Sequence, residues 1–243
     1  MLYHSKSGQV SYGEAIGILL IDSVAPYIPG DVANATTYNF PVRFKKVPGL
    51  TVEKMFSHNK VLKDKILKAA LELQNEGVRA ITGDCGFFAV YQEDLVKHLD
   101  IPVFMSSLLQ IPFMNNLINP KDKIGIITAN AKSLDSTVLQ PCGADLRERL
   151  VIRGLEECPN FSASFIEETG ELDKQEVESE IVAVANQMIA EFPEVKLLLF
   201  ECSVLAPYGP AVQQATGLPI FDFITMINYV YNTVVKKSFT GFM

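Results

Sequence analysis

The sequence lacks the features of several large protein classes. It has no run of Lys and Arg and carries a net charge of −7, which argues against binding to nucleic acid or to an anionic membrane surface. It contains no apolar stretch of about 18 residues, the length of a membrane-spanning helix. Residues 1–8 are polar and lack the apolar segment of a signal peptide. We therefore expect a cytoplasmic protein without nucleic-acid or membrane partners.

Cysteine and histidine are both scarce. Four cysteines in a chain of 243 residues do not make a disulfide scaffold, and no two of them form a Cys-x-x-Cys pair. The three histidines, His4, His58 and His98, do not have the spacing of metal ligands. The sequence thus predicts no metal site, and each cysteine needs its own explanation.

Two of the cysteines end the matching segments of an internal repeat. Residues 78–85 align without a gap with residues 195–202, and each segment ends in a cysteine. The alignment continues at the same offset as far as Phe104 and Phe221. Each unit consists of an apolar strand, an acidic residue, a cysteine, a loop, a helix and, after a proline, another apolar strand. Two such halves can place two thiols opposite each other across a cleft.

The pattern along the chain is typical of an α/β fold. Apolar runs at 14–21 and 123–128 indicate buried parallel strands, because they do not alternate with polar residues. Amphipathic segments at 61–73 and 181–189 predict helices before the two cysteine strands, and Asp173 is a candidate cap for the second. This alternation predicts two similar lobes with parallel-sheet cores, related by pseudo-twofold symmetry, and an active site in the cleft between them.

The boundary between the lobes is expected in the polar, proline-containing turn near Asn119. We expect a first lobe over residues 1–118, a second lobe over residues 119–225, and a last helix, about 226–243, that packs back on the first lobe. The connection 25–43 contains three prolines, so a lid or binding loop is expected there rather than regular structure.

Ligands of open α/β sheets bind at the carboxyl ends of the strands, where both repeat cysteines are expected to lie. A lone cysteine is more often a small buried hydrophobe, but two at equivalent positions of a repeat favour a function. We predict Cys85 and Cys202 as catalytic residues, and Cys142 and Cys158 as bystanders. Neighbouring residues are predicted to bind the substrate, with capping of the next turn as the alternative for the polar ones. They are Asp22, Ser23, Phe40, Gly86, Phe87, Thr128, Asn130 and Ser203.

The acidic residues before the two cysteines, Asp84 and Glu201, are expected to be structural, with tuning of a thiol as the alternative. On a regular strand they would point away from the thiol face, and a carboxylate close to a thiol would raise its pKa and oppose its ionisation. Solvent, or pairing with Arg79 or Lys196, would satisfy them. Arg43 either meets a substrate carboxylate or lies in an edge strand.

These segments, 83–87 and 201–203 in two α/β halves, make the sequence resemble the aspartate/glutamate racemase superfamily over Ile16 to about Ile227. The resemblance implies cofactor-independent proton transfer at the carbon next to a carboxylate, with one cysteine as thiolate base and the other as thiol acid. The expected protein is an isomerase, a racemase or epimerase of an amino acid or related carboxylic acid. A homodimer or larger homo-oligomer would fit.

The substrate stays open, because the Cys-Asn-Thr and Gly-Cys-Thr-His motifs of glutamate racemases and the Asn-Pro-Asn-Thr segment of hydantoin racemases are absent. The sequence is therefore closer to an uncharacterised branch of the superfamily. The alternatives are a maleate-type cis-trans isomerase, an arylmalonate-type decarboxylase and a non-catalytic protein that binds a small acid.

Overall fold

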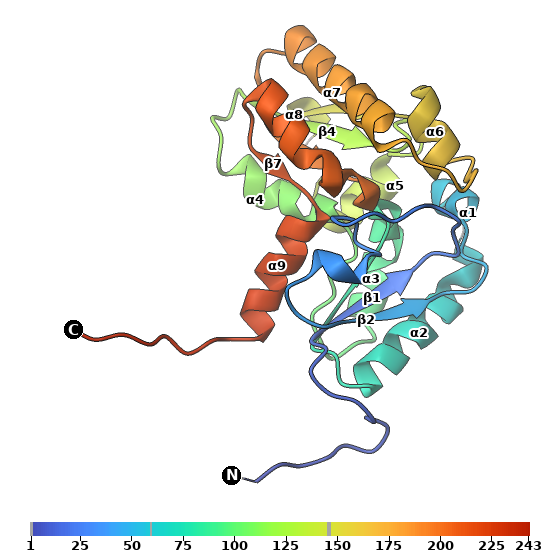
Figure 1. Ribbon diagram of the computed structural model, residues 1–243, viewed down its shortest axis with the longest axis vertical. Coiled ribbons are helices and arrows are strands. Elements are labelled where there is room, and N and C mark those ends of the chain that lie inside the picture. Colours follow the sequence, from blue (N-terminus) through green and yellow to red (C-terminus); the bar gives the residue numbers. More distant parts are fainter. Residues whose placement is uncertain (1, 59, 145–146) are drawn as a thin grey trace.

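The computed structural model describes residues 2–58, 60–144 and 147–243 (Figure 1). Its strands form two parallel sheets, one in each half of the chain. The first sheet has the order β2–β1–β3, with β1 (Ile16–Leu20), β2 (Val42–Lys46) and β3 (Ala80–Gly83). The second has the order β5–β4–β6–β7, with β4 (Lys123–Thr128), β5 (Leu150–Gly154), β6 (Val195–Phe200) and β7 (Ile220–Phe221).

The two sheets repeat the same arrangement. A parallel bridge from Ile81 to Val103 occupies the place in the first sheet that β7 has in the second. The 3-10 helices η3 (Gly86–Tyr91) and η7 (Ser203–Tyr208) each start at the residue after a repeat cysteine. The predicted α/β fold with two similar parallel-sheet lobes is therefore confirmed.

The first sheet is covered on both faces. Helix α2 (Lys63–Asn75) packs on the face that carries Leu19 and Ile81, and α9 (Phe223–Val234), from the end of the chain, packs on the face of Ile16 and Ile18. Figure 1 shows α9 leaving the second sheet and running along the first. Successive residues of β1 point to opposite faces, so one short apolar strand contributes to both layers.

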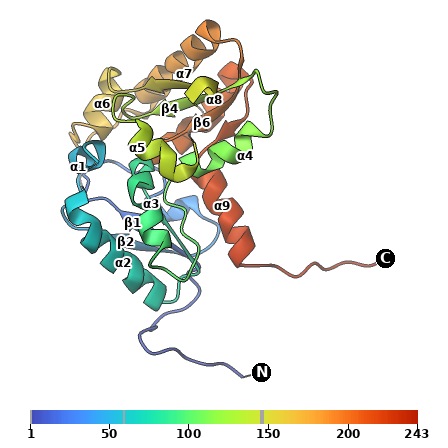
Figure 2. The ribbon, with the colours of Figure 1, turned by 180° about the vertical axis from the view of Figure 1, so that it is seen from behind.

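The second sheet is also covered on both faces. Helices α6 (Pro159–Phe165), α7 (Lys174–Glu191) and α8 (Gly209–Thr216) pack together on one face. Helices α4 (Ile111–Asn115) and α5 (Ser136–Leu139) lie on the other, as Figure 2 shows from behind. The Asp173 side chain caps α7 as predicted, accepting from the N–H groups of the second and third helical residues.

The remaining helices are short. They are α1 (Val52–Phe56), α3 (Gln92–Val96), and the 3-10 turns η1 (Ala35–Thr37), η2 (Lys60–Leu62), η4 (Ser107–Gln110), η5 (Gln140–Cys142) and η6 (Arg147–Arg149). None of the described helices is long and apolar enough to cross a membrane.

Three local expectations need correction. Val61 belongs to η2 and is 83% exposed, so the buried stripe of α2 starts after it. The last helix begins at Phe223 and ends at Val234, and residues 236–243 beyond it are exposed, Phe239 fully so. The proline-rich connection is not wholly irregular: it contains η1 and leads into β2.

Arg43 lies in β2, the edge strand of the first sheet. Its side chain is mostly buried in ion pairs and is not free to meet a substrate. Its guanidinium forms ion pairs with Glu14 at 3.0 Å and Glu76 at 2.8 Å. These contacts fix the strand to the segment before β1 and to the end of α2.

Candidate active site

A small cavity between the carboxyl ends of the two sheets contains both repeat cysteines. Cys85 follows β3 and Cys202 follows β6, and each precedes the first residue of a 3-10 helix. The volume of this cavity is about 40 Å³. The other lining residues are Ile21, Ser23, Ala25, Tyr27, Val52, Phe56, Asp84, Phe87, Ala129, Phe165, Ser203 and Val204.

Hydrogen bonds between the halves fix the two strand ends relative to each other. The hydroxyl of Ser203, next to Cys202, donates to the backbone carbonyl of Asp84, next to Cys85. The hydroxyl of Ser107 donates to the carbonyl of Phe200, at the end of β6, at 2.9 Å. Because these groups are buried, the bonds hold the two thiols in one constant arrangement.

Each thiol faces a backbone amide of the helical turn that follows it. The amide of Phe87 lies near the Cys85 thiol and that of Val204 near the Cys202 thiol, and each lowers the pKa of its thiol and so favours the thiolate, although neither cysteine side chain caps its helical turn with a hydrogen bond. Burial nevertheless raises the pKa of both thiols well above the ordinary value, and the Glu201 carboxyl raises them further. Burial and the nearby acid therefore favour the neutral thiol form of both cysteines.

Glu201 is a buried acid directly behind the thiols. It is 0% exposed, and its Oε2 accepts a hydrogen bond from the Thr128 hydroxyl at 2.7 Å. Its Oε1 has no partner among the described residues and lies against the backbone of Gly86. Burial raises the pKa of Glu201 to about 7, so the carboxyl is largely protonated in a slightly acidic medium.

Asp84 is the second buried acid, and its side chain lies in the cavity wall. One carboxylate oxygen accepts from the N–H of Ile21 at 3.0 Å, and burial raises the pKa of this carboxyl to about 7. Neither Arg79 nor Lys196 pairs with the acids as expected: each donates to a backbone carbonyl instead. Strand β3 ends at Gly83, so strand alternation does not direct Asp84 away from the thiols.

The structure brings together part of the predicted substrate-binding set. Ser23, Phe87 and Ser203 line the cavity with the two cysteines. Gly86 and Thr128 lie one layer behind, against the Glu201 carboxyl.

Three other predicted residues lie away from the cavity. The carboxylate of Asp22 accepts a backbone N–H of the β2–α1 connection and pairs with a lysine of β2. Asn130 accepts from the N–H of Ser133, the capping role that was its alternative. The ring of Phe40 stacks on that of Tyr231 in α9, with 3.5 Å between the centroids. A position at a strand end thus does not decide which way a polar side chain turns.

Tyr27, Phe56 and Asp84 line the cavity but were not predicted to bind the substrate. Tyr27 lies in the proline-rich connection 25–43, for which the sequence predicted a binding loop. The prediction covered this segment but did not single out Tyr27. Phe56, at the end of α1, had no signal in the sequence. Cys142 is buried in the core and Cys158 precedes α6, and neither lines the cavity.

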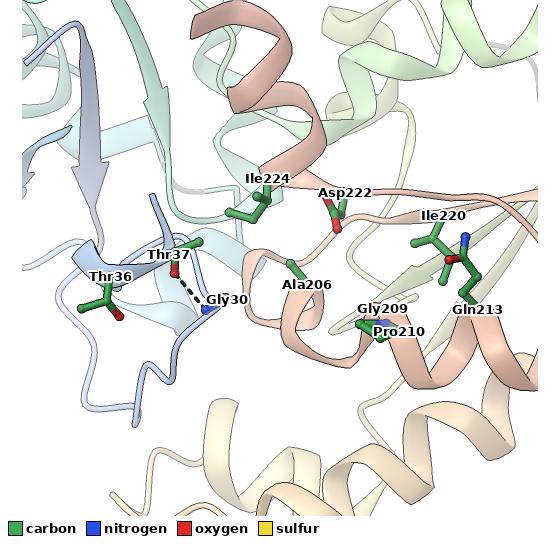
Figure 3. Close-up of a pocket in the computed structure, with 10 residues that line it drawn as sticks. All are labelled: Gly30, Thr36, Thr37, Ala206, Gly209, Pro210, Gln213, Ile220, Asp222 and Ile224. Carbon is green, nitrogen blue, oxygen red and sulfur yellow. Dashed lines mark hydrogen bonds between the residues drawn. The ribbon is translucent and has the colours of Figure 1, made fainter. Parts of the chain in front are cut away.

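A second, more open pocket of about 500 Å³ lies between the loop around Gly30 and the start of α8 (Figure 3). Its wall includes Thr36, Thr37, Gln213 and Asp222 but no cysteine. The larger space is therefore not where the thiols can act. No group of His, Cys, Asp and Glu able to hold a metal ion occurs within the described part of the chain.

Glu201→Gln is expected to flatten the dependence of folding stability on pH. A carboxyl whose folded pKa is raised to about 7 stabilises the fold below its unfolded pKa and loses that contribution as pH rises through 7. The variant should therefore gain about 2 kcal/mol over the wild type between about pH 5 and pH 8.5. Urea unfolding at both pH values measures this, with the exposed Glu157→Gln as control. An unchanged slope in Glu201→Gln would contradict the assignment.

The fold places the chain in a structural class. Unliganded arylmalonate decarboxylase superposes with a TM-score of 0.57 at 13% identity, covering 93% of this chain and 94% of that one. A glutamate racemase isoform from Bacillus anthracis gives 0.58 at 13% identity, covering 92% and 85%. Allantoin racemase from Pseudomonas fluorescens gives 0.56 at 16% identity, covering 91% of each chain. The chain therefore has the fold of the aspartate/glutamate racemase superfamily.

Sequence relatives define the family more narrowly. The chain is 34% identical over 235 residues to a dimethylsulfoniopropionate lyase of Durusdinium sp. clade D, covering 93% of this chain and 77% of that enzyme. It is 33% identical over 225 residues to dimethylsulfoniopropionate lyase 7 of Emiliania huxleyi, covering 88% and 65%. No family model matches the sequence. The chain belongs to the dimethylsulfoniopropionate lyase family, and it spans 61 to 77% of the length of four relatives that it matches at 33 to 34% identity.

This membership overturns the expected activity. The prediction of an isomerase that racemises an amino acid or related acid is wrong, because the relatives at 33 to 34% identity are named as lyases. The resemblance to racemases is one of fold.

Proposed function

We propose that this chain is a lyase that breaks a carbon–sulfur bond of dimethylsulfoniopropionate or a close analogue, with cysteine as the base. Two observations support the proposal. The chain belongs to a family whose members are named for this substrate. The cavity that holds both repeat cysteines is small, which suits a substrate built on a three-carbon acid.

The reaction starts at the carbon next to the carboxylate. A thiolate removes one proton from this carbon, and the electron pair left behind is shared with the carboxylate. The pair then forms a carbon–carbon double bond, while the electrons of the carbon–sulfur bond stay with sulfur. The products are acrylate and neutral dimethyl sulfide, and the proton on the cysteine returns to solvent. Atoms and charge balance without a cofactor.

Backbone amides at the cavity are suited to stabilise the charge that develops. The N–H groups of Phe87 and Val204, the second residues of η3 and η7, lie near the two thiols and are held in place by these helical turns. Such fixed donors stabilise negative charge on a thiolate or on an adjacent carboxylate without having to reorient.

We assign the base to Cys202. The helical segment after Cys202, η7 and α8, is longer than η3 and α3 after Cys85, and the positive end of a helix favours negative charge at its start. An elimination needs one base, so Cys85 serves as the opposite wall of the site.

Incubation of the purified chain with dimethylsulfoniopropionate tests the proposal. Headspace gas chromatography should detect dimethyl sulfide, and proton NMR should show acrylate in equal amount. A protein-free sample at the same pH corrects for elimination by hydroxide. Absence of both products above that control would refute the proposed activity.

A further inference from the structure

The charged side chains at the cavity are acids and not bases. Asp84 provides the one carboxylate among its described lining residues, and none of these residues is Lys, Arg or His. Two more buried acids lie close enough to influence the thiols: Glu201 acts on both, and Asp31, which is 1% exposed, acts on Cys202. A plain carboxylate would enter this cavity against the field, whereas a ligand that also carries a positive charge would be attracted.

Aromatic rings form much of the wall around Asp84. Tyr27 lies near enough for the Asp84 charge to act on its hydroxyl, which is also close to Ser23. The rings of Phe56 and Phe87 meet edge to face, with centroids 5.2 Å apart at 75°. Ring faces carry partial negative charge and attract cations that bear methyl groups, which are too weakly hydrated to prefer water.

We propose that Asp84, Tyr27, Phe56 and Phe87 form the subsite for a methylated cationic head, and that this subsite selects a zwitterionic substrate over a carboxylate of the same shape. The inference rests on the proposed function for the identity of the head, a dimethylsulfonio group. The Asp84 carboxylate attracts the positive charge of the head. The three rings give the subsite its shape and its preference for methyl groups.

This subsite also explains how a thiol can ionise in a cavity without a cationic side chain. Burial and nearby acids raise the pKa of both thiols and favour their neutral form. A bound sulfonium places a positive charge beside them, which lowers the pKa of the thiols. The base then becomes active only when the substrate is present.

Two ligands that differ only in charge test the subsite. Dimethylsulfonioacetate cannot undergo elimination, because the carbon that carries its sulfur is bonded directly to the carboxylate. The isostere 3-methylbutanoate has an uncharged carbon in place of the sulfonium sulfur. Calorimetry at about pH 8 should show wild-type protein binding the sulfonium ligand about tenfold or more tightly than the isostere. Asp84→Asn, which keeps an oxygen for the Ile21 N–H, should reduce this ratio to about one, because it weakens binding of the sulfonium ligand and removes the repulsion of the isostere's carboxylate. Tyr27→Leu should lower the ratio about threefold.

The control is Asp94→Asn, which removes a carboxylate that pairs with Lys63 away from the cavity and should leave the ratio unchanged. Circular dichroism verifies the fold of each variant. Equal affinity for the two ligands in wild type, no sulfonium binding at millimolar concentration, or equal weakening of both ligands in Asp84→Asn each overturns the inference. Because binding is measured without turnover, a preference for sulfonium without release of dimethyl sulfide would refute the proposed reaction alone.

Discussion

Cys202→Ser is expected to lower the rate of dimethyl sulfide release about 1000-fold, since it removes the base of the elimination. A serine hydroxyl ionises far less readily than a thiol, and the Val204 amide is too weak a donor to compensate. Serine is close to cysteine in size and keeps a group that can accept from this amide, so folding should be unaffected. Steady-state rates by headspace gas chromatography measure the loss.

Cys85→Ser should cost about tenfold, because this thiol contributes packing and local polarity rather than proton removal. Cys158→Ser, a half-buried cysteine outside the cavity, is the control and should retain full activity. Full activity in Cys202→Ser would contradict cysteine catalysis in the second half of the chain. A larger loss in Cys85→Ser than in Cys202→Ser would transfer the role of the base to the first half.

The repeat was the part of the structure that the sequence predicted best. Segments 78–85 and 195–202 become equivalent strand ends, and the offset that aligns them also aligns η3 with η7 residue by residue. Backbone geometry follows directly from such a repeat, because apolar runs and turns determine strand and helix positions. For this reason the fold and the shared cavity of Cys85 and Cys202 were accessible without a structure.

The direction of individual side chains was much harder to predict from the sequence. Asp22 and Asp84 both follow apolar strands of the same sheet, yet the first turns to a loop amide and a lysine whereas the second lies in the cavity. The difference depends on contacts made by distant segments, such as the Ile21 amide that meets Asp84. Phe56 likewise reaches the cavity from a separate helix, which no local pattern could indicate.

The type of reaction could not be predicted from the sequence pattern. Racemisation and elimination both begin when a proton leaves the carbon beside a carboxylate, and they differ in what happens next. A racemase returns a proton to the other face, while elimination expels a leaving group that belongs to the substrate. One cysteine at each of two equivalent strand ends fits either reaction. The repeat therefore does not determine whether Cys85 donates a proton or only lines the cavity.

Gly86→Ala is expected to destabilise the fold by about 3 kcal/mol and to displace the catalytic groups. A Cβ at this position would lie 1.9 Å from Oε1 and 2.4 Å from the backbone carbonyl oxygen of Glu201. The Glu201 side chain cannot simply rotate away, since Thr128 holds its other oxygen in a buried site. Relief therefore requires the strand ends of the two halves to separate, which moves Cys85 relative to Cys202.

Gly209→Ala provides the matched comparison, because Gly209 begins α8 in the second half and an added Cβ would meet nothing nearer than 3.9 Å. In a helical conformation alanine is favoured over glycine, so this variant should gain about 0.5 kcal/mol. Urea unfolding of both variants gives the two changes in free energy, which are expected to have opposite signs. A Gly86→Ala variant as stable as Gly209→Ala would show that the strand ends are not packed against each other through Glu201. That result would remove the physical basis for a fixed pair of thiols.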